Sequence, residues 1–158
     1  MKDLKNLLQA EAVRPLIGRL SLALDDSCFD TFLSLCDDPF HYRILVWSPE
    51  LKQQMTWLEH DRQGLADLFN NLPEHLQRLG RLHRQVTVVA VEPSNAEDFL
   101  VVTSSFIVHH TNLQGQTQTL AVGRYIDIVN MSDEKILLAA RDTILDTRDL
   151  GAGLHVPI

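Results

Sequence analysis

Apolar residues in the first half of the chain recur every three or four positions, which is the spacing of one face of a helix. Pro15 lies inside this run, and because proline has no backbone N–H, it begins or kinks a helix. We therefore predict a leading helix over residues 2–13, within an arm of residues 1–14. A first core helix is predicted over residues 15–24.

A second helix is expected directly after the first. Phe29, Phe32 and Leu33 follow helical spacing, residues 25–27 offer an N-cap, and the acidic segment 37–39 ends the helix. All three apolar side chains are expected to face the core.

The next segment combines a strand with a third helix. A short strand is predicted over residues 41–47, and a helix over residues 61–71 with Asp61 as its N-cap. Residues 50–60 show no clear period and fit a long excursion with one helical turn.

The second half of the chain changes to the alternating pattern of strands. Strands are predicted over residues 85–91, 98–110, 117–130 and 136–147. Short turns join the last three, which predicts an antiparallel meander. Gly123 lies in mid-strand, where glycine usually marks a bulge or a bend.

The element order predicts an α+β fold in a single domain over residues 1–158. Strands of about 12 residues twist strongly, so the sheet should be strongly curved. We expect three N-terminal helices packed on the concave face of this antiparallel sheet.

Composition excludes several classes of protein. The chain is 45% hydrophobic with a net charge of −7, and its basic residues form no stripe, which disfavours nucleic-acid binding. No apolar run approaches the ~18 residues of a membrane span, and charges interrupt the segment where a signal peptide would lie. We expect a cytoplasmic protein with no nucleic-acid or membrane partner.

The sequence offers no recognisable metal or cofactor site. Cys28 and Cys36 do not have the spacing of a metal or redox motif, and we expect both to be buried on a helix. His109 and His110 are adjacent on a predicted strand, so they point to opposite faces. We therefore expect no metal ligands and no bound cofactor in this chain.

A curved sheet covered by helices can still enclose a pocket with an acid or a base. The residues that could supply one are Asp30, His41, Tyr42, Tyr125, Asp127 and Asp142. The first four candidates among them are Asp30, His41, Tyr125 and Asp127. Tyr125 and Asp127 share one face of their strand by alternation. Each of these residues equally fits a structural role at the surface or in the core.

Three residues are candidates for a subunit interface. Trp47 and Trp57 lie outside the predicted core stripes, and large apolar side chains in such places mark interfaces or a loop folded onto its own core. Arg141 interrupts an apolar strand and requires a partner, which could be Asp127, Asp146 or a carboxylate of another subunit.

The order of elements resembles the cone-shaped fold of the NTF2-like superfamily. Within it, the sequence is similar to the small (beta) subunits of Rieske non-heme iron ring-hydroxylating oxygenases. The motifs are LSLALDDSCFDTFLSLCDDPFHYRI (20–44), HDRQGLADLF (60–69), HRQVTVVAVEP (83–93), VGRYIDIV (122–129) and AARDTILDT (139–147). The tail RDLGAGLHVPI departs from the usual aromatic tail and resembles the branch serving aromatic acids or sulfonates, which includes methanesulfonate monooxygenase.

The resemblance implies a structural subunit without catalytic residues. The large (alpha) subunit would carry the Rieske 2Fe-2S cluster and the mononuclear iron and would hydroxylate an aromatic acid or a sulfonate. Three large and three small chains would alternate in a hexamer, and a reductase would supply electrons through the large subunit.

Two other hypotheses stay open from the residues alone. One is a free-standing NTF2-like isomerase or dehydratase that uses Asp30, His41, Tyr125 or Asp127. The other is a non-enzymatic binding module that uses the aromatic segment around Trp57.

Overall fold

The computed structural model describes residues 1–72, 80–132, 134–151 and 157–158. Within these residues the chain forms three helices and one six-stranded sheet. The helices are α1 (Lys2–Asp25), α2 (Phe29–Ser34) and α3 (Arg62–Asn70). The strands are β1 (Cys36–Ser48), β2 (Gln53–Asp61), β3 (Arg81–Pro93), β4 (Phe99–Thr111), β5 (Thr117–Asn130) and β6 (Leu137–Leu145).

α1 is one continuous helix, so the predicted break at Pro15 is wrong. Pro15 has no N–H to donate to the carbonyl of Glu11, four residues earlier. Both residues lie on the exposed side of the helix. Water can therefore bind that carbonyl, which removes much of the cost of an internal proline. The opposite side keeps an unbroken buried stripe from Val13 to Leu24.

The two shorter helices begin differently. Asp61 caps α3 as predicted, because its Oδ1 accepts a hydrogen bond from the Gly64 N–H at 2.7 Å. The predicted cap of α2 by residues 25–27 is wrong, since Cys28 is the N-cap and no side chain caps that end. Asp25 instead binds Arg84 of β3.

The sheet has the strand order β2-β1-β6-β5-β4-β3. The meander from β4 to β6 is antiparallel, as predicted, and β3 extends it by pairing antiparallel to β4. By contrast, β1 joins the meander by pairing parallel to β6. The expectation of a fully antiparallel sheet is therefore corrected at this one junction. Residues 50–60 are not a helical excursion, because β2 forms a hairpin with β1.

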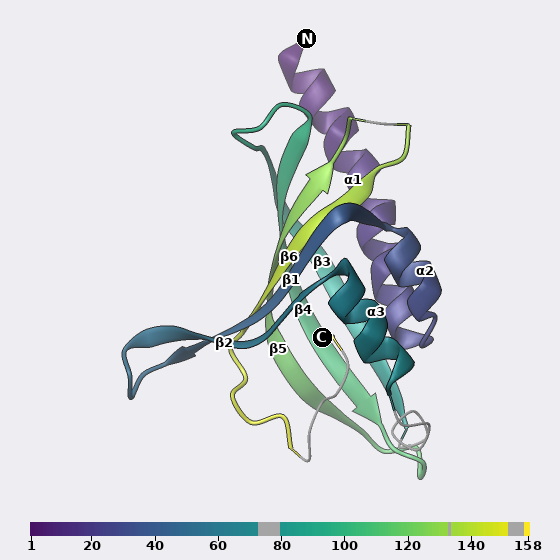
Figure 1. Cartoon of the computed structure of the whole chain (residues 1–158), viewed down its shortest axis with the longest axis vertical. Helices are drawn as coiled ribbons and strands as arrows, with labels where there is room; N and C mark the ends of the chain where they lie inside the picture. Colours follow the sequence, from purple (N-terminus) through teal and green to yellow (C-terminus); the bar gives the residue numbers. More distant parts are fainter. Residues whose placement is uncertain (73–79, 133, 152–156) are drawn as a thin grey trace.

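The helices cover one face of the curved sheet, which we call the inner face (Figure 1). Alternation along β5 buries its odd-numbered residues from Ala121 to Val129 and leaves most of their neighbours partly exposed. These side chains join those of the helices in one hydrophobic core. In the described parts of the chain, no helix combines the length and hydrophobicity needed to cross a membrane.

Gly123 forms no bulge. The β5 register shifts elsewhere, against β6 between Ile128 and Val129 and against β4 between Val108 and His109. A Cβ at Gly123 would lie 2.1 Å from the Ile144 carbonyl oxygen and 3.0 Å from the Phe106 ring. The predicted bulge is wrong, and glycine is required by the close approach of β6 and Phe106.

We expect Gly123→Ala to destabilise the fold by about 3 kcal/mol, because the added methyl group must displace backbone. Gly18→Ala is the matched control, since nothing lies within 4 Å of a Cβ there. It should raise the stability by about 0.5–1 kcal/mol through its better helix propensity. Urea unfolding followed by circular dichroism measures both changes, and equal effects of the two substitutions would contradict this account.

Candidate functional site

A buried ion pair lies at the centre of the inner face. The β5–β6 register places Asp127 opposite Arg141. Arg141 Nε donates to Asp127 Oδ1 at 2.8 Å and Nη2 donates to Oδ2 at 2.9 Å. Both side chains are fully buried. The predicted pairing of Arg141 with Asp127 is thus confirmed.

The guanidinium of Arg141 also lies 4.0 Å from the centre of the Tyr125 ring, in a cation–π contact. Burial alone would lower the pKa of Arg141, but the charge and hydrogen bonds of Asp127 outweigh it and raise that pKa. Tyr125 stacks on Phe106 with ring centres 4.3 Å apart. Burial raises the pKa of Tyr125, so its hydroxyl stays protonated.

A second buried pair joins α1 to β3. Arg84 Nη1 donates to Asp25 Oδ1 at 2.6 Å, and the Arg84 backbone N–H donates to Asp25 Oδ2 at 3.0 Å. The sequence reasoning missed both residues. The alternating pattern of the strand does indicate burial for Arg84, because Arg84 lies on the same face as Leu82 and Val86, which pack on the core.

The four acid–base candidates do not converge on one site. Asp30 is exposed in the first turn of α2. His41 is exposed, and its Nε2 lies 2.7 Å from Glu59 Oε1. Tyr125 and Asp127 lie buried in the core instead. This dispersal gives no support to the interpretation as a free-standing isomerase or dehydratase.

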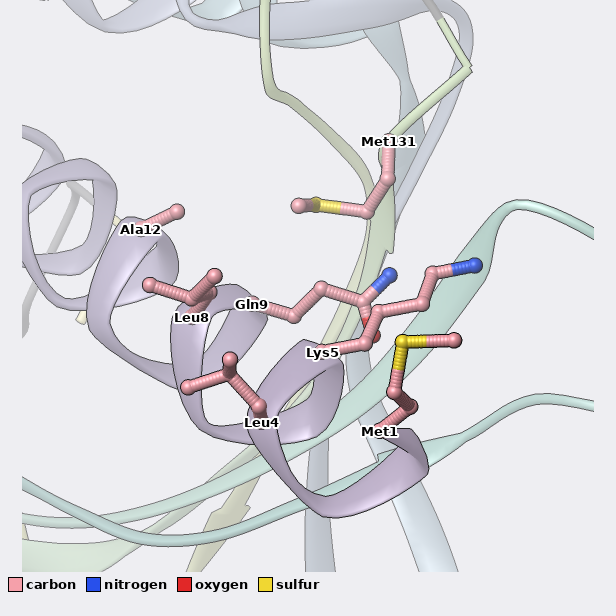
Figure 2. A pocket seen from close by; sticks show the side chains of 7 residues that line it. All are labelled: Met1, Leu4, Lys5, Leu8, Gln9, Ala12 and Met131. Carbon is pink, nitrogen blue, oxygen red and sulfur yellow. The ribbon is translucent and has the colours of Figure 1, made fainter.

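A groove of about 370 Å³ lies beside the first turns of α1. Figure 2 shows its lining, which comes from the start of the chain, from α1 and, on the other side, from Met131. The lining residues are Met1, Leu4, Lys5, Leu8, Gln9, Ala12 and Met131. Lys5 is the one ionisable side chain among them, so the groove offers an apolar contact surface and no acid–base pair.

The cysteines are not placed as expected. Cys28 is exposed before α2, and Cys36 is buried at the start of β1, so neither lies in a helix. Among the described residues, no three His, Cys, Asp or Glu side chains lie close enough to hold a metal ion.

Two of the three interface candidates lie at the surface. The β1–β2 hairpin projects away from the sheet (Figure 1), and Trp47 and Trp57 on it are 55% and 43% exposed. Leu51 and Met55 of the same hairpin are also exposed. Arg141 is corrected as an interface candidate, because the chain itself buries it completely.

Comparisons with known proteins identify the class of this fold and then its family. A beta subunit assigned to an aromatic-ring-hydroxylating dioxygenase of Novosphingobium aromaticivorans superposes with a TM-score of 0.81 at 19% identity, covering 96% of this chain and 98% of that one. The chain therefore has the fold of that beta subunit. A model of the ring hydroxylating beta subunit family matches residues 20–151. The chain belongs to this family.

Two curated relatives support the assignment. The beta subunit of the methanesulfonate monooxygenase hydroxylase of Methylosulfonomonas methylovora is 34% identical over 157 residues, covering 94% of this chain and 87% of the relative. The beta subunit of the 2-aminobenzenesulfonate 2,3-dioxygenase of Alcaligenes sp is 33% identical over 135 residues, covering 85% of this chain and 89% of the relative.

We expect Asp127→Asn to cost about 3–5 kcal/mol, because it leaves the Arg141 charge buried without its counter-charge. Asp142→Asn is the matched control. Asp142 also binds an arginine through two hydrogen bonds, from Arg43, but these two side chains are 28% and 36% exposed. The control should cost less than about 1 kcal/mol. Urea unfolding measures both, and similar losses would show that burial does not set the strength of the central pair.

The two thiols should differ in their rate of alkylation, because Cys28 is exposed and Cys36 is buried. Burial raises the pKa of Cys36 to about 12, whereas Cys28 is exposed. At pH 8 only about 10⁻⁴ of Cys36 would be thiolate, so iodoacetamide should modify Cys28 alone in the native protein. Mass spectrometry locates the label, and Cys28→Ser is the control that should abolish it. Rapid native labelling of Cys36 would show that its position is open to solvent.

Proposed function

We propose that this chain is the structural beta subunit of the terminal component of a multicomponent Rieske oxygenase. The family match over residues 20–151 carries this proposal. Both curated relatives are beta subunits of oxygenases whose names specify a sulfonate. The substrate class that we propose for the whole complex is therefore an organic sulfonate, with an aromatic acid as the alternative.

The catalytic centres are proposed to reside in a separate alpha subunit. This subunit would hold the Rieske 2Fe-2S cluster and the mononuclear iron, and it would receive electrons from a reductase. The described residues of the present chain supply no cluster of potential metal ligands, which agrees with this division. The complex would be a cytoplasmic alternating hexamer of three alpha and three beta chains.

In the complex, this chain would act as a rigid subunit whose surface binds the alpha subunit. The Asp127–Arg141 and Asp25–Arg84 pairs fix strand register and helix position inside the fold. The β1–β2 hairpin carries exposed aromatic side chains away from this body. Buried tryptophans commonly dominate the binding energy of interfaces, so we propose that Trp47 and Trp57 insert into the alpha subunit.

We expect the double variant Trp47→Ala, Trp57→Ala to weaken capture of the alpha subunit by at least about tenfold, since it removes two large anchors. The measurement is co-purification with this chain tagged, followed by the mass of its partner and the visible absorption of an iron–sulfur cluster. Leu113→Ala, in the exposed β4–β5 turn, is the control and should leave capture unchanged.

The same experiment tests the function itself. The tagged wild-type chain should bring down a larger protein with iron–sulfur absorbance, while the isolated chain binds no iron. Stoichiometric iron on the isolated chain, or a colourless homo-oligomer without a partner from the source organism, would overturn the proposal. Undiminished capture by the double tryptophan variant would overturn only the assignment of the hairpin.

A further inference from the structure

Residues 157 and 158 lie inside the fold. Pro157 is buried, and Ile158 has no exposed surface and joins the main hydrophobic core. Figure 1 marks this end of the chain in front of the sheet, beside α3. Contacts with the rest of the chain hold these two residues in place.

Polar side chains of the sheet hold the segment by its backbone. The Ile158 N–H donates to Tyr42 Oη at 3.1 Å, and the same hydroxyl donates to the Ile158 carbonyl at 3.3 Å. Arg84 Nη2 donates to the Pro157 carbonyl at 2.7 Å. Backbone hydrogen bonds combined with a buried side chain are the way in which peptide-binding domains hold short segments.

Tyr42 and Arg84, which hold the segment, are themselves positioned by contacts that do not involve the segment. Asp25 of α1 binds the guanidinium and the backbone N–H of Arg84. The Thr143 hydroxyl donates to Tyr42 Oη at 3.3 Å. The groups that hold the segment are thus fixed by α1 and by neighbouring strands, and a preorganised site loses less entropy when it binds.

The interior also has more polar groups than its own contacts use. Within the described residues, Arg84 Nε, Ser104 Oγ, Tyr125 Oη and Arg141 Nη1 are buried without a hydrogen-bond partner. Ser104 and Tyr125 are opposite each other in the β4–β5 register. Packed cores rarely leave buried polar atoms unpaired, and one of these atoms belongs to Arg84, whose Nη2 binds the segment.

We infer that the inner face of the sheet is a peptide-binding site that holds the chain's own Pro157–Ile158 segment as its ligand. The ligand class is a short peptide in which proline is followed by a branched apolar residue. The site recognises the backbone N–H and carbonyl of that branched residue. Once these two residues are removed, the site should bind such a peptide added separately. This inference is independent of the proposed oxygenase role.

The test uses the chain shortened by residues 157 and 158 and a labelled synthetic peptide spanning residues 152–158. Fluorescence anisotropy should show saturable one-to-one binding. Two control peptides separate recognition from general hydrophobic attraction: one N-methylated at Ile158, which removes the donor to Tyr42, and one carrying Ile158→Asp. Each control should bind at least about tenfold more weakly, and Tyr42→Phe in the shortened chain should weaken the native peptide by a similar factor.

The shortened chain need not fold alone for the test to decide. If circular dichroism shows it unfolded, the native peptide should restore the native spectrum in a saturable manner, and the control peptides should fail to do so. In the full chain, Tyr42→Phe should retain the fold and speed hydrogen exchange of the Ile158 amide by at least about tenfold. Absence of both binding and restoration, or equal binding of the native and N-methylated peptides, would overturn the inference.

Discussion

The bidentate pair between Asp127 and Arg141 is the interaction on which the sheet depends. Removing two charges from water costs several kcal/mol per ion, which only close pairing with good geometry offsets. The pair forms in one register of β5 against β6, because a slip of one strand by one residue would place the two charges on opposite faces of the sheet. In that register Arg141 also lies opposite Tyr42 of β1. The pair therefore fixes the antiparallel meander and also the parallel junction that joins it to the hairpin.

The second pair, Asp25 with Arg84, fixes the position of α1 at the β3 edge of the sheet. It fastens the end of α1 to β3, so the helical layer and the last strand of the sheet are held by a charge contact as well as by apolar packing. Buried ion pairs are weak sources of stability but can specify a single arrangement. Two of them in one small core are consistent with a protein whose task is to keep a defined shape within an assembly.

The sequence predicted those parts of the fold in which burial imposes a period. The strands of the meander were found because their alternate residues are buried, and the N-cap of α3 because its chemistry is local. β2 was missed because none of its side chains is fully buried, so no alternation was available to detect. Asp127 was among the predicted partners of Arg141 because it lies on the adjacent strand. The contacts of Arg84 with Asp25 and Pro157 join residues 59 and 73 positions apart, and no local pattern encodes them.

A fold that encloses a cone can serve as an enzyme or as a framework, and the contents of the interior decide between them. Here the inner face holds an ion pair, the stacked rings of Phe106 and Tyr125, and the side chain of Ile158. The acidic and basic side chains in this space form ion pairs with one another, and the candidates Asp30 and His41 face solvent on other elements. Because the chain's own residues occupy the interior, recognition of a partner subunit falls to the outside, where the projecting hairpin and the apolar groove along α1 offer surfaces that such a subunit can bury.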